Sequence, residues 1–465
     1  MVFCYDRRPI KQKLYQHKYT MACNIDQFLE QNTPNNEPLR GKYMKSFGYH
    51  SLMRRMPAVF TEITGLLKAK QFNLANKEEI NNVIDQLELL LSEILNNNPL
   101  RKIDSTSTLS LIWNQILEKK FNSDSVVTWF DTEWLFTENY LYIRLKEIFE
   151  KTKTLQNYDP FKQLKYNAFD ESETTMIAIA EFLNFQFSKK ELDDTSLKAL
   201  FIQMLKICLW GNRFDLSLNI GKSKNITEDP LEAIVSLDKY ILADHSDEIW
   251  NTLNVSIDKN PKIIDIILDN SAYELFTDMC LADFFVTYGF AEVVIFHGKS
   301  IPWYVSDVTK PDFEHFLNRL EKQCTSSALQ KIGNRWNNYY TAGKFVIECE
   351  EFWTLPHCYS AMANEDSELY KKLATSQLLI FKGDLNYRKL IGDINWEPST
   401  TFKDALCRFQ PTAVVALRTL KCDCVCGLNS DYETKIDVND KDNNYLSTTN
   451  YWQVNGKYAV VHLSK

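Results

Sequence analysis

Apolar residues in the first half of the chain recur at the spacing of amphipathic helices. Residues 53–68 and 78–95 place apolar side chains three or four positions apart, and the second segment ends at Asn96–Pro99. Further helices are predicted over residues 129–149, 173–187 and 192–209. No strand pattern occurs before about residue 255, so we expect a helical first half.

The period changes after residue 255, where short apolar runs alternate with helical segments. Helices are predicted over residues 273–288 and 310–323, and strands over residues 262–268, 292–296, 344–348, 378–381, 413–417 and 458–462. Alternating strands and helices favour right-handed crossovers and a mostly parallel, doubly wound sheet. Continuous apolar strands fit burial on both faces. The expected fold class is therefore α/β.

These patterns divide the chain into three expected regions: an irregular or disordered extension (1–44), a helical N-terminal domain (45–255) and an α/β domain (256–465). Residues 1–20 are basic but contain no apolar core, so a secretory signal is not predicted. A weak organelle presequence is the alternative to a disordered extension. The expected location is the cytoplasm, with the nucleus as a further compartment.

Composition and charge exclude several classes of partner. Apolar residues make up 45% and charged residues 25% of the 465 residues, as in an ordinary globular protein. The net charge of −8 argues against general attraction to nucleic acid or anionic membranes. No stretch approaches the roughly 20 apolar residues of a membrane span. A small-molecule ligand is expected, and the sequence does not indicate an oligomeric state.

The chain has 11 cysteines and no Cys-x-x-Cys pair. Cys422, Cys424 and Cys426 alternate, so on a strand they would point to one face. They could bind a soft metal or respond to redox conditions, but zinc sites usually use the looped Cys-x-x-Cys spacing. The favoured interpretation is that they are small apolar residues in the core of a protein from a reducing compartment.

Polar side chains gather where the predicted strands end. Asp269, Asn270 and Ser271 follow the first strand, with Glu274 one helical turn later, and the loop after the second strand ends at Asp307. Segment 381–390 passes from an apolar strand into a dense polar cluster, and segment 417–421 holds two cations. The carboxyl ends of parallel strands share one edge of a sheet, where open α/β folds bind ligands.

The residue types at this edge suit a metal ion and a phosphate. Asp269, Asn270 and Asp307 offer the hard oxygen ligands that Mg²⁺ or Mn²⁺ prefers. Arg388 and Lys421 suit phosphate oxygens. Taken singly, Asp307 is more readily a helix cap and Arg418 an ordinary ion pair. Only the combination indicates a metal-and-phosphate site.

Three enzyme classes fit these loops poorly. A methyltransferase that binds S-adenosylmethionine usually has a glycine-rich turn after its first strand, and residues 268–273 contain no glycine. A dinucleotide-binding fold lacks its Gly-x-Gly-x-x-Gly motif. A phosphatase with an Asp-x-Asp nucleophile motif would need an acid at Ser271.

Several segments resemble the damage-control phosphatase family, formerly a domain of unknown function. The match is to its sugar-phosphate subgroup, which carries an Arg-Thr-x-Lys motif and whose animal members were also named acidic residue methyltransferases. The similar segments are residues 134–144, 209–217, 268–275, 305–307, 352–356, 381–390 and 417–421. The resemblance runs from about residue 45 to the end, and segment 381–390 is its most specific part.

The resemblance implies a Rossmann-like α/β/α sandwich after a helical domain. It also implies metal-dependent hydrolysis of sugar phosphates such as fructose 1-phosphate and fructose 6-phosphate, with Mn²⁺, Co²⁺ or Ni²⁺ favoured and Mg²⁺ as an alternative. The implied metal ligands are Asp269, Asn270 and Asp307. The implied catalytic residues are Asp269, Asn270 and Lys421, and the implied substrate contacts are Asp269, Asn270, Asp384, Leu385, Asn386, Tyr387, Arg388 and Lys421. Further candidates are Asn212, Asp215, Glu274 and Arg418; for Asn212 and Asp215 the alternative is a helix C-terminus and its cap.

Two positions depart from the family pattern. Ala272 stands where Gly is usual in Asp-Asn-x-Gly, which either narrows the backbone approach to the ligand or fits an allowed helical φ. Residues 392–396 read Gly-Asp-Ile-Asn-Trp where Gly-Asp-Arg-Lys-Trp is common, so two cations are missing near the site loop. The proposed metal ligands are unaltered.

The resulting hypothesis is a single-metal phosphomonoesterase. Lys421 and Arg388 would stabilise the transferring phosphoryl group, and loss of Arg388 would raise KM most. Asp384 would orient the sugar hydroxyls or protonate the leaving alkoxide. The nucleophile is either an activated water or a carboxylate. The alternatives are a protein carboxyl (glutamate) methyltransferase and a helical interaction module with a decayed catalytic domain.

Overall fold

The computed structural model describes residues 28–69, 77–189, 191–220, 230–255, 262–441 and 451–465, with only the backbone described at 213–220, 230 and 231. Most of the predicted N-terminal extension thus lies outside the described residues. The chain divides into two compact units, Met1–Pro160 and Phe161–Lys465. Within the described residues, no helix combines the length and the apolar character needed to cross a bilayer.

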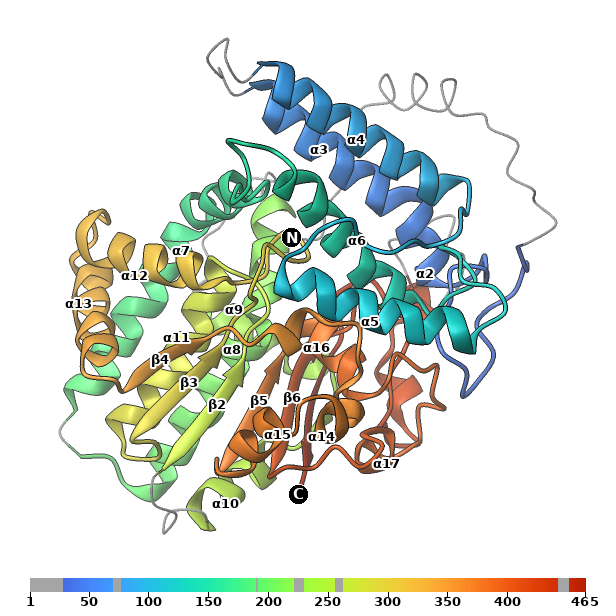
Figure 1. Ribbon diagram of the computed structural model, residues 1–465. Helices are drawn as coiled ribbons and strands as arrows, with labels where there is room; N and C mark the ends of the chain where they lie inside the picture. The colour runs from blue at the N-terminus through green and yellow to red at the C-terminus, as the bar shows by residue number, and fades with distance from the viewer. Residues whose placement is uncertain (1–27, 70–76, 190, 221–229, 256–261, 442–450) are drawn as a thin grey trace. The chain divides into compact units, whose positions relative to one another are not determined.

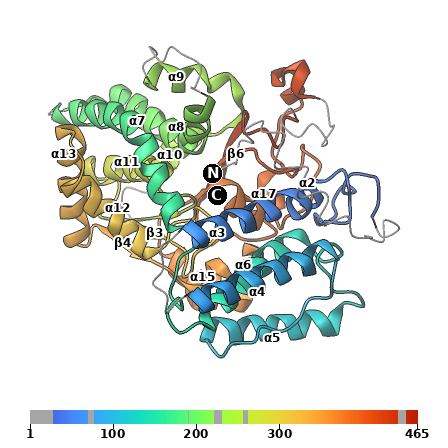
Figure 2. The same ribbon diagram turned by 90° about the horizontal axis from the view of Figure 1, so that it is seen from above.

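The first unit is helical, as predicted (Figures 1 and 2). Its elements are α2 (Phe47–His50), a π-helical turn (Ser51–Arg55), α3 (Met56–Ala69), α4 (Lys77–Leu95), α5 (Thr108–Ser123) and α6 (Trp134–Glu150). Helix α4 buries the apolar stripe that its sequence predicts, from Ile80 to Ile94. Helix α6 is buried around most of its circumference, so its polar side chains need partners inside the protein.

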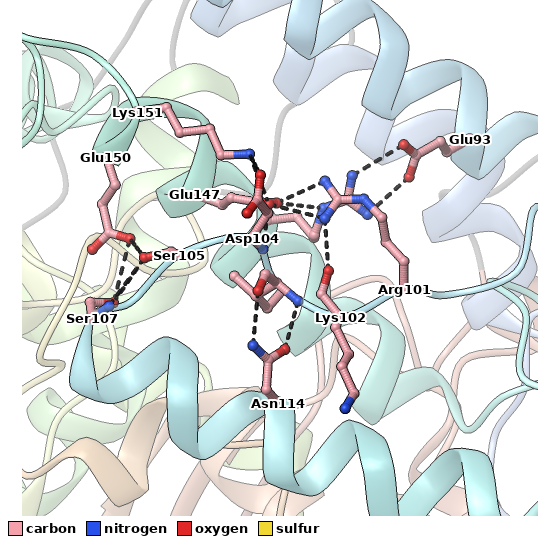
Figure 3. Close-up of polar contacts among 12 residues, drawn as sticks. Glu93, Arg101, Lys102, Asp104, Ser105, Ser107, Asn114, Glu147, Glu150 and Lys151 are labelled. Atoms are coloured by element: carbon pink, nitrogen blue, oxygen red, sulfur yellow. Dashed lines mark hydrogen bonds and ion pairs between the residues drawn. The ribbon is translucent and has the colours of Figure 1, made fainter.

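Figure 3 shows how those partners are provided within the first unit. The buried carboxylate of Glu147 pairs with Arg101 (2.9 Å) and with Arg144 (3.0 Å), and it accepts the backbone N–H of Asp104 (2.7 Å). Arg144 also pairs with Glu93 on α4 at 2.9 Å. The network joins α4, α6 and the segment before α5, and loss of one partner would leave a buried charge uncompensated.

The second unit is built on a seven-stranded sheet of order β1-β7-β6-β5-β2-β3-β4. The strands are β1 (Ile241–Asp244), β2 (Ile263–Ile267), β3 (Val293–His297), β4 (Phe345–Glu348), β5 (Leu378–Lys382), β6 (Val414–Thr419) and β7 (Ala459–Ser464). Strands β6, β5, β2, β3 and β4 are parallel, whereas β7 runs antiparallel to β6. The prediction of an α/β fold with a mostly parallel sheet is confirmed.

Strand β1 corrects the expectation that no strand precedes residue 255. It pairs in parallel with β7 at the edge of the sheet. Its four residues are too few to establish a period, and only its pairing with β7 identifies it. The sheet therefore begins before the predicted domain boundary.

Helices α7 (Lys162–Ser188), α8 (Asp194–Ile220), α9 (Pro230–Ser236) and α10 (Ser246–Val255) also belong to the second unit. The boundary between the two compact units follows Pro160, whereas the sequence predicted a domain boundary near residue 255. The reason is packing: α8 lies along α11 (Tyr273–Thr287) and shares one buried apolar core with it and with the sheet.

The remaining helices complete the layers. They are α12 (Lys310–Lys322), α13 (Ser327–Thr341), α14 (Met362–Glu365), α15 (Ser367–Ala374), α16 (Gly383–Leu390) and α17 (Phe402–Ala405). Figures 1 and 2 place α8 and α11 on one face of the sheet and α15 on the other. Helix α16 follows β5 directly, so it begins at the carboxyl edge where the polar clusters meet.

Candidate active site

Two loops at the carboxyl edge are joined by backbone pairing. Asn270, after β2, forms a β-bridge with Asp307, which lies in the loop after β3. The Ser271 N–H donates to the carbonyl of Ser306 (2.8 Å), and the Val308 N–H donates to the carbonyl of Asp269 (3.0 Å). The structure thus brings Asp307 next to Asp269 and Asn270, which lie far from it in sequence.

The acids at this junction are buried and close to one another. Burial raises the pKa of Asp269 well above its usual value, and the charges of Glu274 and Asp307 add to the increase, while Lys299 and Lys421 oppose it. Burial also raises the pKa of Asp307 to about 6, despite the nearby Lys299. Carboxylates that repel one another in a buried place create a site that favours a cation.

One oxygen of Asp307 has a buried cation beside it. Its Oδ2 lies 3.3 Å from Lys299 Nζ, and this charge opposes the increase in the pKa of Asp307 that burial causes. The Lys299 ammonium also donates to the carbonyl of Leu268 (2.7 Å). A buried carboxylate that already faces a cation can also serve as an oxygen ligand of a metal ion.

Glu274, the first-turn acid of α11, organises two amides. Its Oε2 accepts a hydrogen bond from Asn270 Nδ2 (2.7 Å) and one from Asn212 Nδ2 (2.8 Å). Asn270 Nδ2 also donates to Asp269 Oδ2 at 2.8 Å, and Asn270 Oδ1 accepts from Ser306. Because the donor side of Asn270 faces the acids, its oxygen is oriented as an acceptor or ligand.

Asn212 does not lie at the helix end that the capping interpretation requires. Helix α8 continues to Ile220, so Asn212 and Asp215 lie inside the helix and do not end it. The alternative of a C-terminal cap is therefore wrong, because the predicted helix ended too early. Asn212 joins the acidic cluster, whereas the side chain of Asp215 lies outside the described residues.

Ala272 adopts φ 58° and ψ −122°, a conformation that glycine normally occupies. The suggestion that it fits an allowed helical φ is therefore wrong. The backbone must reverse here between β2 and α11, and the pairing of residues 270 and 271 with the 306–307 loop holds it in place. An alanine in this region stores local strain of order 1–3 kcal/mol.

Gly383 allows α16 to begin against the acidic cluster. Its φ of +79° lies in the left-handed region, and a β-carbon at this position would lie 1.9 Å from Asp269 Oδ2. Both the conformation and the contact therefore require glycine.

The side chains after Gly383 divide into two groups. Asp384 is partly exposed and accepts hydrogen bonds from Arg418 Nε (2.7 Å) and from the Lys421 N–H (3.3 Å). Leu385, Asn386, Tyr387 and Arg388 are buried. Asn386 Nδ2 donates to the carbonyls of Lys382, Leu268 and Ile267, which fastens α16 to the end of β2.

Arg388 and Tyr387 have partners inside the protein. Arg388 donates to both carboxylate oxygens of Asp393, at 2.7 and 3.1 Å. The Tyr387 hydroxyl lies 3.3 Å from Cys426 Sγ and 3.4 Å from His462 Nδ1. Both side chains are therefore engaged by other groups of the protein in this structure.

Two buried lysines have roles that sequence reasoning missed. Lys299 lies beside Asp307, as described above, and Lys382 pairs with Asp278 (2.8 Å) and Glu274 (3.4 Å) beneath the cluster. Lys382 ends the apolar run of β5. A lone charge at the end of a buried strand was the available signal, but its partners on α11 were not visible in the sequence.

Comparison with known proteins identifies the family. A family model described as "Damage-control phosphatase ARMT1-like domain" matches residues 51–435. A Danio rerio protein named "Damage-control phosphatase ARMT1" is 33% identical over 443 residues, which cover 92% of this chain and 97% of that protein. The Homo sapiens protein of the same name is 33% identical over 437 residues, which cover 91% of this chain and 97% of that protein. A crystal structure of a DUF89 family protein from Pyrococcus horikoshii is similar at 16% identity with a TM-score of 0.42, over 82% of this chain and 96% of that chain. On the evidence of the family model and these relatives, the chain belongs to the ARMT1-like damage-control phosphatase family.

Proposed function

We propose that the chain hydrolyses phosphate monoesters of small sugars with a divalent metal ion held by Asp269, Asn270 and Asp307. The observation that carries the proposal is the Asn270–Asp307 bridge, which sets a buried carboxylate beside an amide that Glu274 and Ser306 orient. Membership of a phosphatase family supports the reaction class.

The donor set fits a hard divalent cation. Asp269 and Asp307 are buried acids whose negative charges oppose one another, and a cation between them would offset that repulsion. Carboxylate and amide oxygens suit Mn²⁺, Co²⁺, Ni²⁺ or Mg²⁺. A bound ion would polarise a phosphate oxygen and so favour attack at phosphorus.

The first turn of α16 and Lys421 are proposed to hold the phosphate. The first N–H groups of a helix have no intrahelical acceptor and lie at the positive end of its dipole. Because the side chains of residues 385–388 are buried, we propose that this segment contacts the substrate through backbone N–H groups. Lys421 would stabilise the negative charge that develops on the transferring group.

Asp384 is proposed to face the sugar. Arg418 is fully buried and bonds Asp384 together with two backbone carbonyls, so it fixes the carboxylate at the rim of the site. From there Asp384 would orient sugar hydroxyls or protonate the leaving alkoxide. Loss of hydroxyl contacts would raise KM, whereas loss of the proton donor would lower kcat.

The nucleophile is an activated water or the carboxylate of Asp269. Acid quenching during turnover of a radiolabelled substrate distinguishes the two. A phosphoryl group retained on wild-type protein and located on Asp269 by peptide mass spectrometry supports the carboxylate. An unlabelled wild-type protein under the same conditions supports water.

The central test is phosphate release from chelator-treated protein. Fructose 1-phosphate and fructose 6-phosphate are supplied with each of the four metals in turn. We expect activity only with metal and at least a 100-fold loss in Asp269→Asn and Asp307→Asn, with Glu292→Gln, an exposed acid, as the control. Absence of phosphate release from every sugar phosphate with every metal would refute the proposal.

Carboxyl methylation is not favoured. The relatives carry a phosphatase name, and the turn from Leu268 to Ala272 contains no glycine to admit a cofactor close to the backbone. Incubation with labelled S-adenosylmethionine is expected to give no methyl transfer to acidic proteins under conditions that support phosphate release.

A further inference from the structure

Two thiols lie together in the loop that follows β6. Cys422 Sγ and Cys424 Sγ are 3.6 Å apart, and both side chains are fully buried. Two thiolates bound at about 2.3 Å to one tetrahedral metal ion are separated by about 3.8 Å. A disulfide requires about 2.05 Å. The observed spacing is close to that of two thiolates on a shared metal ion.

A buried carboxylate supplies a third donor. One carboxylate oxygen of Asp393 and the sulfur atoms of Cys422 and Cys424 all lie within 4.8 Å of one another. Two thiolates with a carboxylate form a donor set that zinc accepts. The sulfur donors give this cluster a different metal preference from the oxygen donors Asp269 and Asn270, because soft ligands select thiophilic metals.

Two guanidinium groups hold these donors in place. Arg418 donates to the carbonyls of Cys424 (2.6 Å) and Cys422 (3.1 Å), which fixes the backbone from which both thiols extend. Arg388 donates to both oxygens of the Asp393 carboxylate. Hydrogen bonds that orient ligands in this way are a general feature of metal sites.

We propose that Cys422, Cys424 and Asp393 form a second metal site for a thiophilic divalent cation such as Zn²⁺ or Cd²⁺. It is distinct from the oxygen-donor site and does not depend on the proposed function. Arg418 bonds both the cysteine carbonyls and Asp384, so an ion bound here would stiffen the loop that carries Lys421.

Titration of the reduced, metal-free full chain with Cd²⁺ tests the proposal through thiolate-to-cadmium charge-transfer absorbance. We expect saturation at a single equivalent and loss of the signal in the Cys422→Ser/Cys424→Ser double variant. Asp393→Asn should weaken binding at least tenfold. Cys407→Ser, at an exposed cysteine outside the cluster, and Asp269→Asn should both retain the signal. A wild type without the band, or a double variant that keeps it, would overturn the proposal.

X-ray absorption of zinc-loaded Asp269→Asn protein provides a test with the cysteines unchanged, should the double variant fail to fold. Two sulfur neighbours per zinc ion are expected. A shell of oxygen and nitrogen alone would overturn the proposal. Because the oxygen-donor site is disabled in this variant, the result stands whether or not the chain proves to be a sugar phosphatase.

Discussion

Gly383 lies against Asp269 so closely that a β-carbon at position 383 would be 1.9 Å from Asp269 Oδ2. The contact joins the start of α16 to the loop after β2. It links the most specific segment of the sequence, residues 381–390, to the proposed metal ligand without any polar side chain of that segment taking part.

Gly383→Ala should therefore abolish phosphatase activity and reduce the free energy of unfolding by about 3 kcal/mol, because it adds a steric clash to a left-handed φ. Phosphate release and urea unfolding measure the two effects. Gly289→Ala is the matched control: its φ is +74°, but nothing lies within 4 Å of the added carbon. It should cost about 1 kcal/mol and leave activity intact. Equal loss of activity in both variants would show that the Asp269 contact is unimportant.

Ala272→Gly should stabilise the protein by about 1 kcal/mol. The native φ of 58° and ψ of −122° strain an alanine and suit a glycine. Thermal and denaturant unfolding measure the change. Ala282→Gly, at a buried position in the interior of α11, is expected to destabilise the protein by a similar or larger amount. A loss of stability in Ala272→Gly would contradict the strain argument.

Glu274→Gln should weaken metal binding by about 10- to 100-fold without unfolding the protein. The carboxylate accepts from Asn270 and Asn212 through Oε2 and pairs with Lys382 through Oε1. An amide loses the charge and puts an NH2 group, which cannot accept, opposite the lysine. Calorimetric titration with Mn²⁺ measures the affinity, and circular dichroism checks the fold. The exposed Glu292→Gln variant is the control, and an unchanged affinity in Glu274→Gln would remove Glu274 from the site.

Arg388→Met should lower stability more than it alters KM. Its guanidinium pairs with the buried Asp393, so loss of the cation leaves an unpaired buried charge at a cost of about 3–5 kcal/mol. Lys421→Met should instead impair turnover in a stable protein. Unfolding curves give the stability of both variants, and steady-state kinetics give their KM and kcat. A larger KM increase for Arg388→Met than for Lys421→Met would restore the sequence-based assignment of Arg388 to the phosphate.

Stability should fall as pH rises from about 6.5 to 9. Burial alone would lower the pKa of His297, but hydrogen bonds with Asp265 (2.6 Å) and Glu350 (3.0 Å) raise it to about 9. A raised pKa in the folded state gives stability that is complete below the unfolded value and disappears above the folded one, here up to about 3 kcal/mol. Urea unfolding from pH 6 to 10 measures the slope, which His297→Gln should flatten. An equal slope in the variant would assign the effect to other groups.

The local sequence pattern was sufficient to predict an element that contains several helical turns or several alternations of apolar and polar residues. Helix α4 and strands β2, β3 and β5 fall close to their predicted positions because their burial is encoded in consecutive residues. Strand β1 was missed because its pairing with β7 is not local. The end of α8 was misplaced for a related reason: Asn212, beyond the predicted end, bonds Glu274 on α11, which is distant in sequence.

The sequence by itself determined the fold class, the family and the chemistry available at the carboxyl edge of the sheet. Only the tertiary structure decided which polar side chains are bonded to other groups inside the protein. Asn386 and Arg388 look as suitable for a ligand as Asp384, yet their hydrogen bonds are taken up by Lys382, Leu268 and Asp393. The type of a residue limits what its side chain can bind. The partner that the side chain has in the folded protein depends on groups that folding brings together from distant parts of the chain.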